Sequence, residues 1–300
     1  MENFESRVNL TDLTQKVESI KKELATYLVG QADLVDFLII ALLADGHVLI
    51  EGVPGVAKTL TAKLIAKTIN ADFKRIQFTA DLMPSDITGT SIYNSKTNDF
   101  EFKQGPLFTN IALADEINRA PAKTQAALFE AMEEKQITID GKTYLLGNPF
   151  MVIATQNPIE QEGTYRLPEA QLDRFVFKLI VNYPSLEEET SILQNSHTNK
   201  NSMDLTKINP ILNKNDIAQL RSTVSNIIIE EHLLKYIAQI VASTRKNPSL
   251  YLGASPRASI AILNAAKACA CMRGRDFVSP DDIKHVSTPV LRHRVMLTPE

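Results

Sequence analysis

The sequence predicts an α/β protein in which a five-stranded, mainly parallel sheet lies between helices, followed by a small helical lid domain. Short apolar runs alternate with helical segments through residues 1–183, and the runs are almost entirely apolar. This pattern is typical of parallel strands covered by helices on both faces. After Tyr183-Pro184 strand-like runs stop and helical faces remain. We therefore divide the chain into a core of residues 1–183, which includes an N-terminal helix, and a lid of residues 184–300.

The core elements follow from periodicity and turn signals. A helix is predicted at Leu13–Leu28 because its apolar residues recur every three or four positions. The Asp140-Gly141 turn predicts a hairpin over Gln136–Leu145, and a second hairpin is predicted over Ser91–Phe102. The five predicted strands are His47–Glu51, Phe73–Phe78, Ile111–Ala114, Phe150–Thr155 and Phe175–Val181. Further core helices are predicted at Ala32–Ala44, Thr59–Ile69 and Pro121–Glu134.

The second domain is predicted to contain helices alone. The polar stretch Asn195–Asn215 is rich in Asn, Ser, Thr and Lys, so we expect a surface connection there. The predicted lid helices are Ile217–Ile227, Glu230–Thr244, Ser255–Met272 and Pro280–Val290.

Composition narrows the possible partners and the compartment. The net charge of -3 gives no overall attraction toward nucleic acid or anionic membranes, so nucleic acid is not an expected partner. The longest apolar run, Phe37–Ala44, is far shorter than the ~20 residues of a membrane span. Cys269 and Cys271 are expected to be buried, reduced thiols. Because the N-terminus also lacks a signal-peptide core, we expect a cytoplasmic protein.

The stretch from His47 to Leu60 is the strongest functional signal. An apolar strand meets a turn rich in Gly and Pro, which opens into a helix near Lys58. Backbone N–H groups in such a loop bind phosphates, Lys58 would contact the β- and γ-phosphates of ATP, and Thr59 would ligate Mg²⁺. Ala57 stands where the strict pattern has glycine. The alternative is an ordinary strand–turn–helix with a lysine at its start.

Polar residues end two of the predicted strands. Asp115 and Glu116 follow Ile111–Ala114, and Asn157 follows Phe150–Thr155. The carboxyl ends of parallel strands border the ligand crevice, so Asp115 would hold Mg²⁺ through water and Glu116 would polarise the attacking water. Asn157 would lie beside the γ-phosphate. The alternatives are acids that face solvent and a turn residue before a proline.

Two arginines are further candidates. Arg174 precedes the last strand and is the kind of residue that contacts a phosphate across a subunit interface. Its alternative role is a surface salt bridge with a nearby acid such as Asp173 or Glu169. Arg257 lies in the first turn of a helix that Ser255 would cap, and its alternative is an exposed arginine on that helix.

These motifs together resemble the MoxR family of AAA+ ATPases from about Val29 to the end of the chain. Arg166 departs from the pattern, because family members usually have proline there, and its role stays open; we also expect the end of the chain to be trimmed. The blocks that carry the resemblance are Glu51–Thr59, Ala114–Gln125, Glu130–Glu134, Ala154–Tyr165, Leu172–Phe175, Gly253–Ala258 and Val290–Arg294.

The resemblance implies a role for each candidate. Asp115-Glu116 matches Walker B, Asn157 sensor 1, Arg174 an arginine finger acting in trans, and Arg257 sensor 2. Walker A corresponds to Gly52, Val53, Pro54, Gly55, Val56, Ala57, Lys58 and Thr59, with Leu60 beside it. Val29, Gly30 and Gln31 resemble the segment beside the adenine. The two hairpins resemble the helix-2 insert and the hairpin before sensor 1.

The family implies ATP and Mg²⁺ as cofactors and a homo-oligomer, with a hexameric ring expected. It also implies chaperone-like remodelling of a client protein, with a von Willebrand factor A domain expected in the partner. Two alternatives stay open. One is a DNA-remodelling motor, and the other is a scaffold that binds ATP with little turnover.

Overall fold

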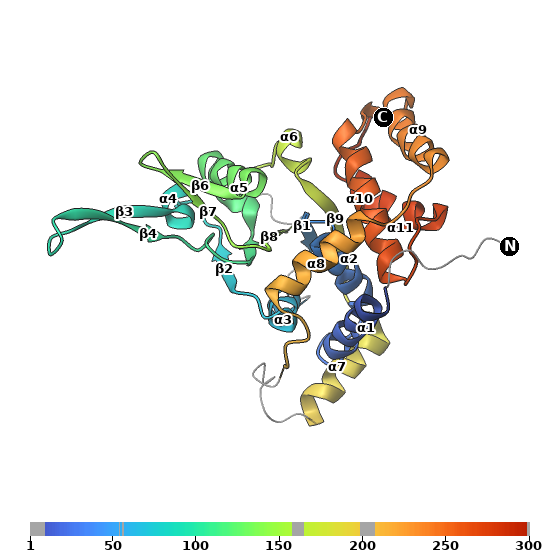
Figure 1. Cartoon of the computed structure of the whole chain (residues 1–300), viewed down its shortest axis with the longest axis horizontal. Helices are drawn as coiled ribbons and strands as arrows, with labels where there is room; N and C mark the ends of the chain where they lie inside the picture. The colour runs from blue at the N-terminus through green and yellow to red at the C-terminus, as the bar shows by residue number, and fades with distance from the viewer. Residues whose placement is uncertain (1–9, 54, 56, 158–164, 199–207, 299–300) are drawn as a thin grey trace.

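The computed structural model describes residues 10–53, 55, 57–157, 165–198 and 208–298. Its centre is a five-stranded sheet in the order β2-β5-β8-β1-β9, in which every pair of neighbours is parallel (Figure 1). The predicted sheet is therefore confirmed. Its strands are β1 (His47–Gly52), β2 (Phe73–Gln77), β5 (Ile111–Asp115), β8 (Met151–Gln156) and β9 (Phe175–Val181).

Two apolar clusters cover the two faces of this sheet. Successive residues of a strand point to opposite faces, so Val48 and Ile50 belong to one cluster and Leu49 to the other. The sandwich is thus a direct consequence of central strands that place apolar side chains on both faces. One cluster includes α1 (Thr11–Ala25), α2 (Ala32–Leu43) and α3 (Lys58–Thr68), and the other includes α4 (Pro84–Thr88) and α5 (Ala122–Glu134).

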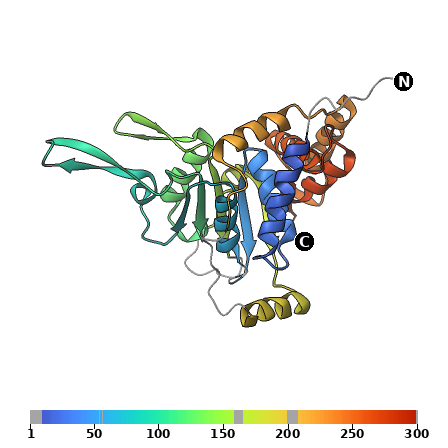
Figure 2. The ribbon, with the colours of Figure 1, turned by 60° about the horizontal axis from the view of Figure 1, so that its bottom comes forward.

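Both predicted hairpins are present and extend away from the sheet on the side opposite the lid helices (Figures 1 and 2). The first pairs β3 (Gly89–Asn94) with β4 (Asp99–Gln104), and the second pairs β6 (Gln136–Ile139) with β7 (Lys142–Leu145). Phe102 of the first stacks on Tyr144 of the second, with ring centroids 4.3 Å apart. The hairpins therefore support each other.

The lid is mainly helical, and its helices share the apolar cluster that contains α1 and α2. The division near Pro184 stays a prediction, since one core continues across it. The lid helices are α8 (Lys214–Ser225), α9 (Glu231–Lys246), α10 (Pro256–Met272) and α11 (Pro280–Leu291).

Two expectations for the lid were wrong, and one helix was not predicted. Leu186–Thr198 forms a helix, α7, which the sequence analysis missed. Short strands β10 (Leu250–Leu252) and β11 (Met296–Leu297) form an antiparallel ribbon although no further strand was expected. The end of the expected surface connection is also packed into the core, because Ile208 and Leu212 are buried.

Arg294 attaches the lid to the sheet. It is 6% exposed, and its Nε lies 2.6 Å from Oδ1 of Asp173. Its Nη1 and Nη2 groups donate to the carbonyl oxygens of Val290, Val176, Phe175 and Asp173 at 2.5–3.3 Å. One buried guanidinium therefore joins the end of α11 to the beginning of β9.

The described helices are not of the membrane-spanning kind, and the two cysteines are free thiols. No helix within the described ranges combines the length and apolar character needed to cross a membrane. Cys269 and Cys271 are free and buried as expected. Burial raises the pKa of each thiol to about 12, so neither is a reactive thiolate near neutral pH.

Candidate functional site

The predicted phosphate loop connects β1 to α3. Gly55 has a φ of +86° and Ala57 adopts the left-handed conformation at φ 56°, ψ 17° directly before Lys58 begins the helix. The first N–H groups of α3 therefore open toward the loop, as an anion site requires. Lys58 Nζ donates to the carbonyl oxygen of Gly52 at 2.7 Å, which folds the side chain back across the loop. Pro54 and Val56 lie outside the described residues.

The structure brings most of the predicted catalytic residues around one cavity of about 420 Å³ beside this loop. That size falls within the range of about 300–1,000 Å³ typical of ligand sites. The cavity is lined by Gly55, Ala57, Lys58, Thr59, Leu60, Arg75, Asp115, Glu116, Thr155 and Asn157. The loop and the carboxyl ends of β5 and β8 thus meet at one edge of the sheet, as the strand order predicts.

Asp115 is 9% exposed and has a hydrogen-bond partner on each carboxylate oxygen. Thr155 Oγ1 donates to Oδ1 at 2.5 Å. Arg75 donates to Oδ2 through Nη2 at 2.6 Å and Nε at 3.0 Å. The carboxylate that was predicted to hold a metal ion therefore forms an ion pair with an arginine from the neighbouring strand.

Glu116 has a left-handed backbone conformation, φ 57° and ψ 48°, which is uncommon for a residue with a side chain. Its N–H donates to Thr155 Oγ1 at 3.0 Å, and Oε2 accepts from Gln77 at 2.7 Å and Arg119 at 2.9 Å. Such conformations concentrate at functional sites, where the surrounding contacts hold them in place. Asn157 is 9% exposed and lines the same cavity.

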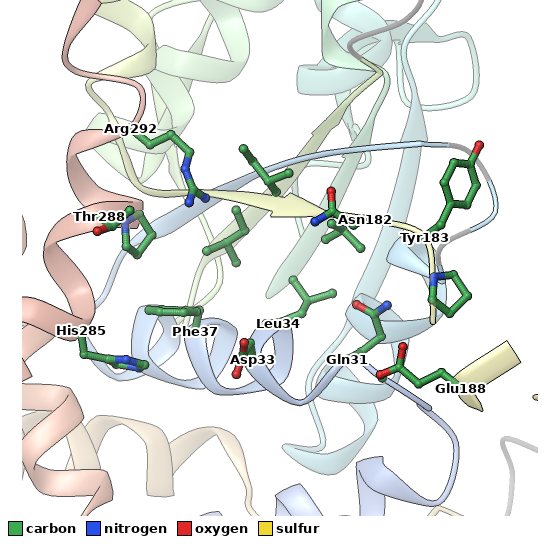
Figure 3. Close-up of a pocket in the computed structure, with 16 residues that line it drawn as sticks. Gln31, Asp33, Leu34, Phe37, Asn182, Tyr183, Glu188, His285, Thr288 and Arg292 are labelled. Atoms are coloured by element: carbon green, nitrogen blue, oxygen red, sulfur yellow. The ribbon is translucent and has the colours of Figure 1, made fainter. Parts of the chain in front are cut away.

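A second cavity, of about 470 Å³, lies beside Gly30 and Gln31, which precede α2. Figure 3 shows it between α2 and the end of β9, where Asn182 and Tyr183 lie, with His285, Thr288 and Arg292 on its far side. Gly30 has a φ of +73°, and a Cβ there would come within 2.5 Å of the Glu188 carboxyl group. The predicted adenine segment thus borders a cavity formed jointly by the core and the lid. Val29 is not among the residues that line either cavity.

Arg174 and Arg257 do not line these two cavities but converge on Glu133 of α5. Arg174 Nη1 lies 2.5 Å from Oε2 of Glu133 and donates to the carbonyl oxygen of Phe129 at 2.7 Å. Arg257 Nη2 lies 2.8 Å from Oε1. Arg174 therefore forms a salt bridge, as its alternative role predicted, but the acid is Glu133. The two acids named as examples have other partners: Asp173 binds Arg294, and Glu169 binds Arg166. Ser255 caps α10 as predicted, by accepting from the Arg257 N–H.

Comparison with known proteins agrees with this geometry. Residues 47–177 match the model of the ATPase family associated with various cellular activities (AAA), and residues 242–300 match the AAA lid domain. The chain is 52% identical over 273 residues to the protein YeaC of Bacillus subtilis, and the matched region covers 91% of this chain and 84% of YeaC. It is 46% identical to Chaperone MoxR1 of Mycobacterium tuberculosis, over 92% of this chain and 74% of that protein.

The chain belongs to the MoxR family of AAA+ ATPases. A crystal structure of a protein from Cytophaga hutchinsonii agrees, with a TM-score of 0.88 and 45% sequence identity over 96% of this chain and 89% of the other. The resemblance identified from the motifs is therefore confirmed, and with it the core and lid architecture.

The family implies a magnesium ion, and the residues beside the loop fit one. Asp115 and Thr59 offer a carboxylate and a hydroxyl at the same cavity, and Mg²⁺ prefers oxygen ligands, usually one or two from the protein together with substrate phosphates. Nowhere in the described part of the chain do three or more His, Cys, Asp or Glu residues gather into a metal cluster. An ion that depends on phosphates for most of its ligands is consistent with this.

Sequence reasoning missed four residues of the site, namely Arg75, Gln77, Arg119 and Glu133. Arg75 and Gln77 lie two positions apart in β2, so they share one face at its carboxyl end. Two polar side chains at this spacing near the carboxyl end of a strand were a usable signal. Glu133 lies in the block Glu130–Glu134 that carries the resemblance, but no pattern indicated its partners, because they come from segments distant in the sequence.

Proposed function

We propose that this protein hydrolyses ATP to ADP and phosphate and uses the cycle to remodel or activate a partner protein. The observation that carries the proposal is the convergence of Lys58, Thr59, Asp115, Glu116 and Asn157 on one cavity at the edge of a parallel sheet. These residues come from three elements, and together they match the needs of phosphoryl transfer to water.

The roles follow from charge and position. Lys58 and the N–H groups at the start of α3 bind the β- and γ-phosphates, and Thr59 and Asp115 hold Mg²⁺. When bound, this ion neutralises charge on the phosphates. Glu116 accepts a hydrogen bond from the attacking water and takes up its proton, while Asn157 orients that water against the terminal phosphate. The adenine occupies the cavity beside Gly30 and Gln31.

We propose that Arg174 acts on the nucleotide of a neighbouring subunit, and that Arg257, which the resemblance implies only as sensor 2, acts there with it. Both are directed to Glu133 rather than to the cavity of their own chain. A pair of guanidiniums held together at one surface suits a phosphate presented by another copy, as arginine fingers do. We therefore propose a closed homo-oligomeric ring, a hexamer in keeping with the family, in which each site is completed by the next subunit. We also propose a cytoplasmic location.

The client is proposed to be a protein, with a von Willebrand factor A domain as the partner module. The relative named Chaperone MoxR1 supports protein remodelling as the purpose of the cycle. The net charge of -3 offers no general attraction for DNA. Turnover stimulated by DNA would favour a DNA-remodelling motor instead.

The test uses two variants of the full chain. Lys58→Ala is expected to lose ATP binding, and Glu116→Gln is expected to bind ATP but lose hydrolysis. A Glu116→Gln protein loaded with ATP should also retain its client in a pull-down. Unchanged ATP affinity in Lys58→Ala, or hydrolysis at the wild-type rate in Glu116→Gln, would contradict the assignment.

The trans role of the arginines is tested by mixing. Arg174→Ala alone should bind ATP without hydrolysing it. Mixed with Glu116→Gln subunits, it should regain part of the activity, because an intact Glu116 then meets an intact Arg174 at some interfaces. Failure of every mixing ratio to restore activity would show that Arg174 does not act across an interface.

A further inference from the structure

Arg75 is a cation placed directly on the carboxylate that the metal ion needs. Its Nη2 and Nε both donate to Oδ2 of Asp115, at 2.6 and 3.0 Å, from the neighbouring strand β2. Its Nη2 also donates to Oε1 of Gln77 at 2.7 Å. Hydrogen bonds between charged groups of this kind are among the stronger ones in proteins. Arg75 therefore satisfies Asp115 in the structure described here.

Asp115 has little freedom to bind a second cation while Arg75 stays. Its other oxygen, Oδ1, accepts from Thr155, whose hydroxyl is itself fixed because it accepts from the Glu116 N–H. The Asp115 side chain is 13% exposed, whereas the Arg75 side chain is 49% exposed and lines the cavity. If one partner moves, it is Arg75, because a half-exposed guanidinium regains water when it leaves.

We propose that Arg75 is the resident counter-ion of Asp115, which occupies Oδ2 while no divalent cation is bound and leaves it when Mg²⁺ and ATP enter. This inference rests on the proposed function, because it takes Asp115 as the carboxylate that holds Mg²⁺. Arg75 removes the penalty of an unpaired, nearly buried carboxylate in the nucleotide-free protein. The same contact makes Arg75 a competitor of the metal ion.

Competition predicts an effect on binding that depends on the metal. Arg75→Gln removes the cation but retains an amide that can donate to Asp115. The variant should bind ATP about five- to tenfold more tightly than wild type in the presence of Mg²⁺, the size expected of one half-exposed charge-assisted contact. With EDTA, its ATP affinity should stay close to that of wild type. The nucleotide-free variant should also melt at a lower temperature than the nucleotide-free wild type.

The experiment measures the dissociation constant of a fluorescent ATP analogue with Mg²⁺ and with EDTA, and compares the ratio of the two constants between proteins. Arg119→Gln is the matched control. Arg119 is 47% exposed, as Arg75 is 49%, and it pairs with Glu116 rather than Asp115. Arg119→Gln should change the two dissociation constants by the same factor, if at all, and leave their ratio as in wild type.

The other outcomes have distinct meanings. If wild type does not bind ATP at all, the proposed function fails and not only the role of Arg75. If Arg75→Gln weakens binding equally with and without Mg²⁺, Arg75 binds the phosphates directly and the competition is refuted. An unchanged ratio, a weakening confined to Mg²⁺, or the same increase in Arg119→Gln would also overturn the proposal.

Discussion

Replacing Arg294 should loosen the lid from the sheet at a large cost in stability. Arg294→Met keeps the apolar stem and approximate length but removes the charge and every donor. In wild type the guanidinium neutralises Asp173 and donates to three backbone carbonyl groups around the beginning of β9 and one near the end of α11. In the variant these acceptors stay in place without their donor.

The magnitude follows from burial. Burial would raise the pKa of Asp173, but hydrogen bonds from Ser255 and Arg294 outweigh it and hold the pKa below its usual value. Breaking a buried ion pair by removing one partner costs about 3–5 kcal/mol. Because Asp173 is 18% exposed and keeps its bond from Ser255, we expect the lower end, a loss of about 3 kcal/mol. For a chain of 300 residues, which unfolds with an entropy of about 2.1 cal/mol/K per residue, that corresponds to a fall in Tm of about 5 °C.

Urea unfolding followed by circular dichroism measures this loss, with Arg292→Met as the control. Arg292 lies two residues away, is exposed, and makes a single 3.3 Å hydrogen bond to the carbonyl oxygen of Lys178. Its replacement should change the free energy of unfolding by no more than about 0.5 kcal/mol. If the free energy of unfolding of Arg294→Met fell by less than about 1 kcal/mol, the reasoning would be refuted, since removing one partner of a buried ion pair should destabilise the protein more than that.

Three further predictions concern the core and the site. Burial lowers the pKa of His47 from 6.5 to about 4, so the unfolded chain binds this proton at a higher pH than the folded protein does. The free energy of unfolding should therefore fall by about 1.4 kcal/mol per pH unit as the pH drops from about 6.5 toward 4. His47→Gln should flatten this slope in unfolding curves, and an unaltered slope would assign it to other groups. Ala57→Gly removes the strain of an alanine in the left-handed conformation but raises the entropy of the unfolded chain. The two effects oppose each other, so the free energy of unfolding should change by less than about 1 kcal/mol, and ATP affinity should stay nearly unchanged. A clear gain in ATP affinity would show that the methyl group of Ala57 obstructs the loop. Glu133→Gln removes the anion between two arginines and should slow ATP turnover about tenfold without weakening ATP binding. The control Glu134→Gln, at the adjacent exposed residue, should turn over ATP at the wild-type rate. Equal steady-state rates for Glu133→Gln and wild type would show that Glu133 has no positioning role.

Local patterns determined much of what could be predicted. The runs that became β1, β5 and β8 are apolar along most of their length because both faces of each strand are covered, and this signature needs no knowledge of the partners. The phosphate loop and the acids at the end of β5 were found for a similar reason. Chain order alone places them at the carboxyl edge of a parallel sheet, where they line one cavity.

Elements without a strong periodic signal were missed. Helix α7 buries none of its described side chains, so its apolar residues leave no single face to detect. The strands β10 and β11 have three and two residues, too few for an alternating pattern. Their pairing is decided by contacts between distant parts of the lid.

By itself the sequence determined the sheet, the phosphate loop and the family. The tertiary structure alone decided which charges meet. Arg75 lies on Asp115 because β2 and β5 are neighbours. Arg174, just before β9, and Arg257, in α10, both reach Glu133 of α5. Ion pairs of this kind depend on distances in space between residues far apart in the chain, and no local pattern encodes them.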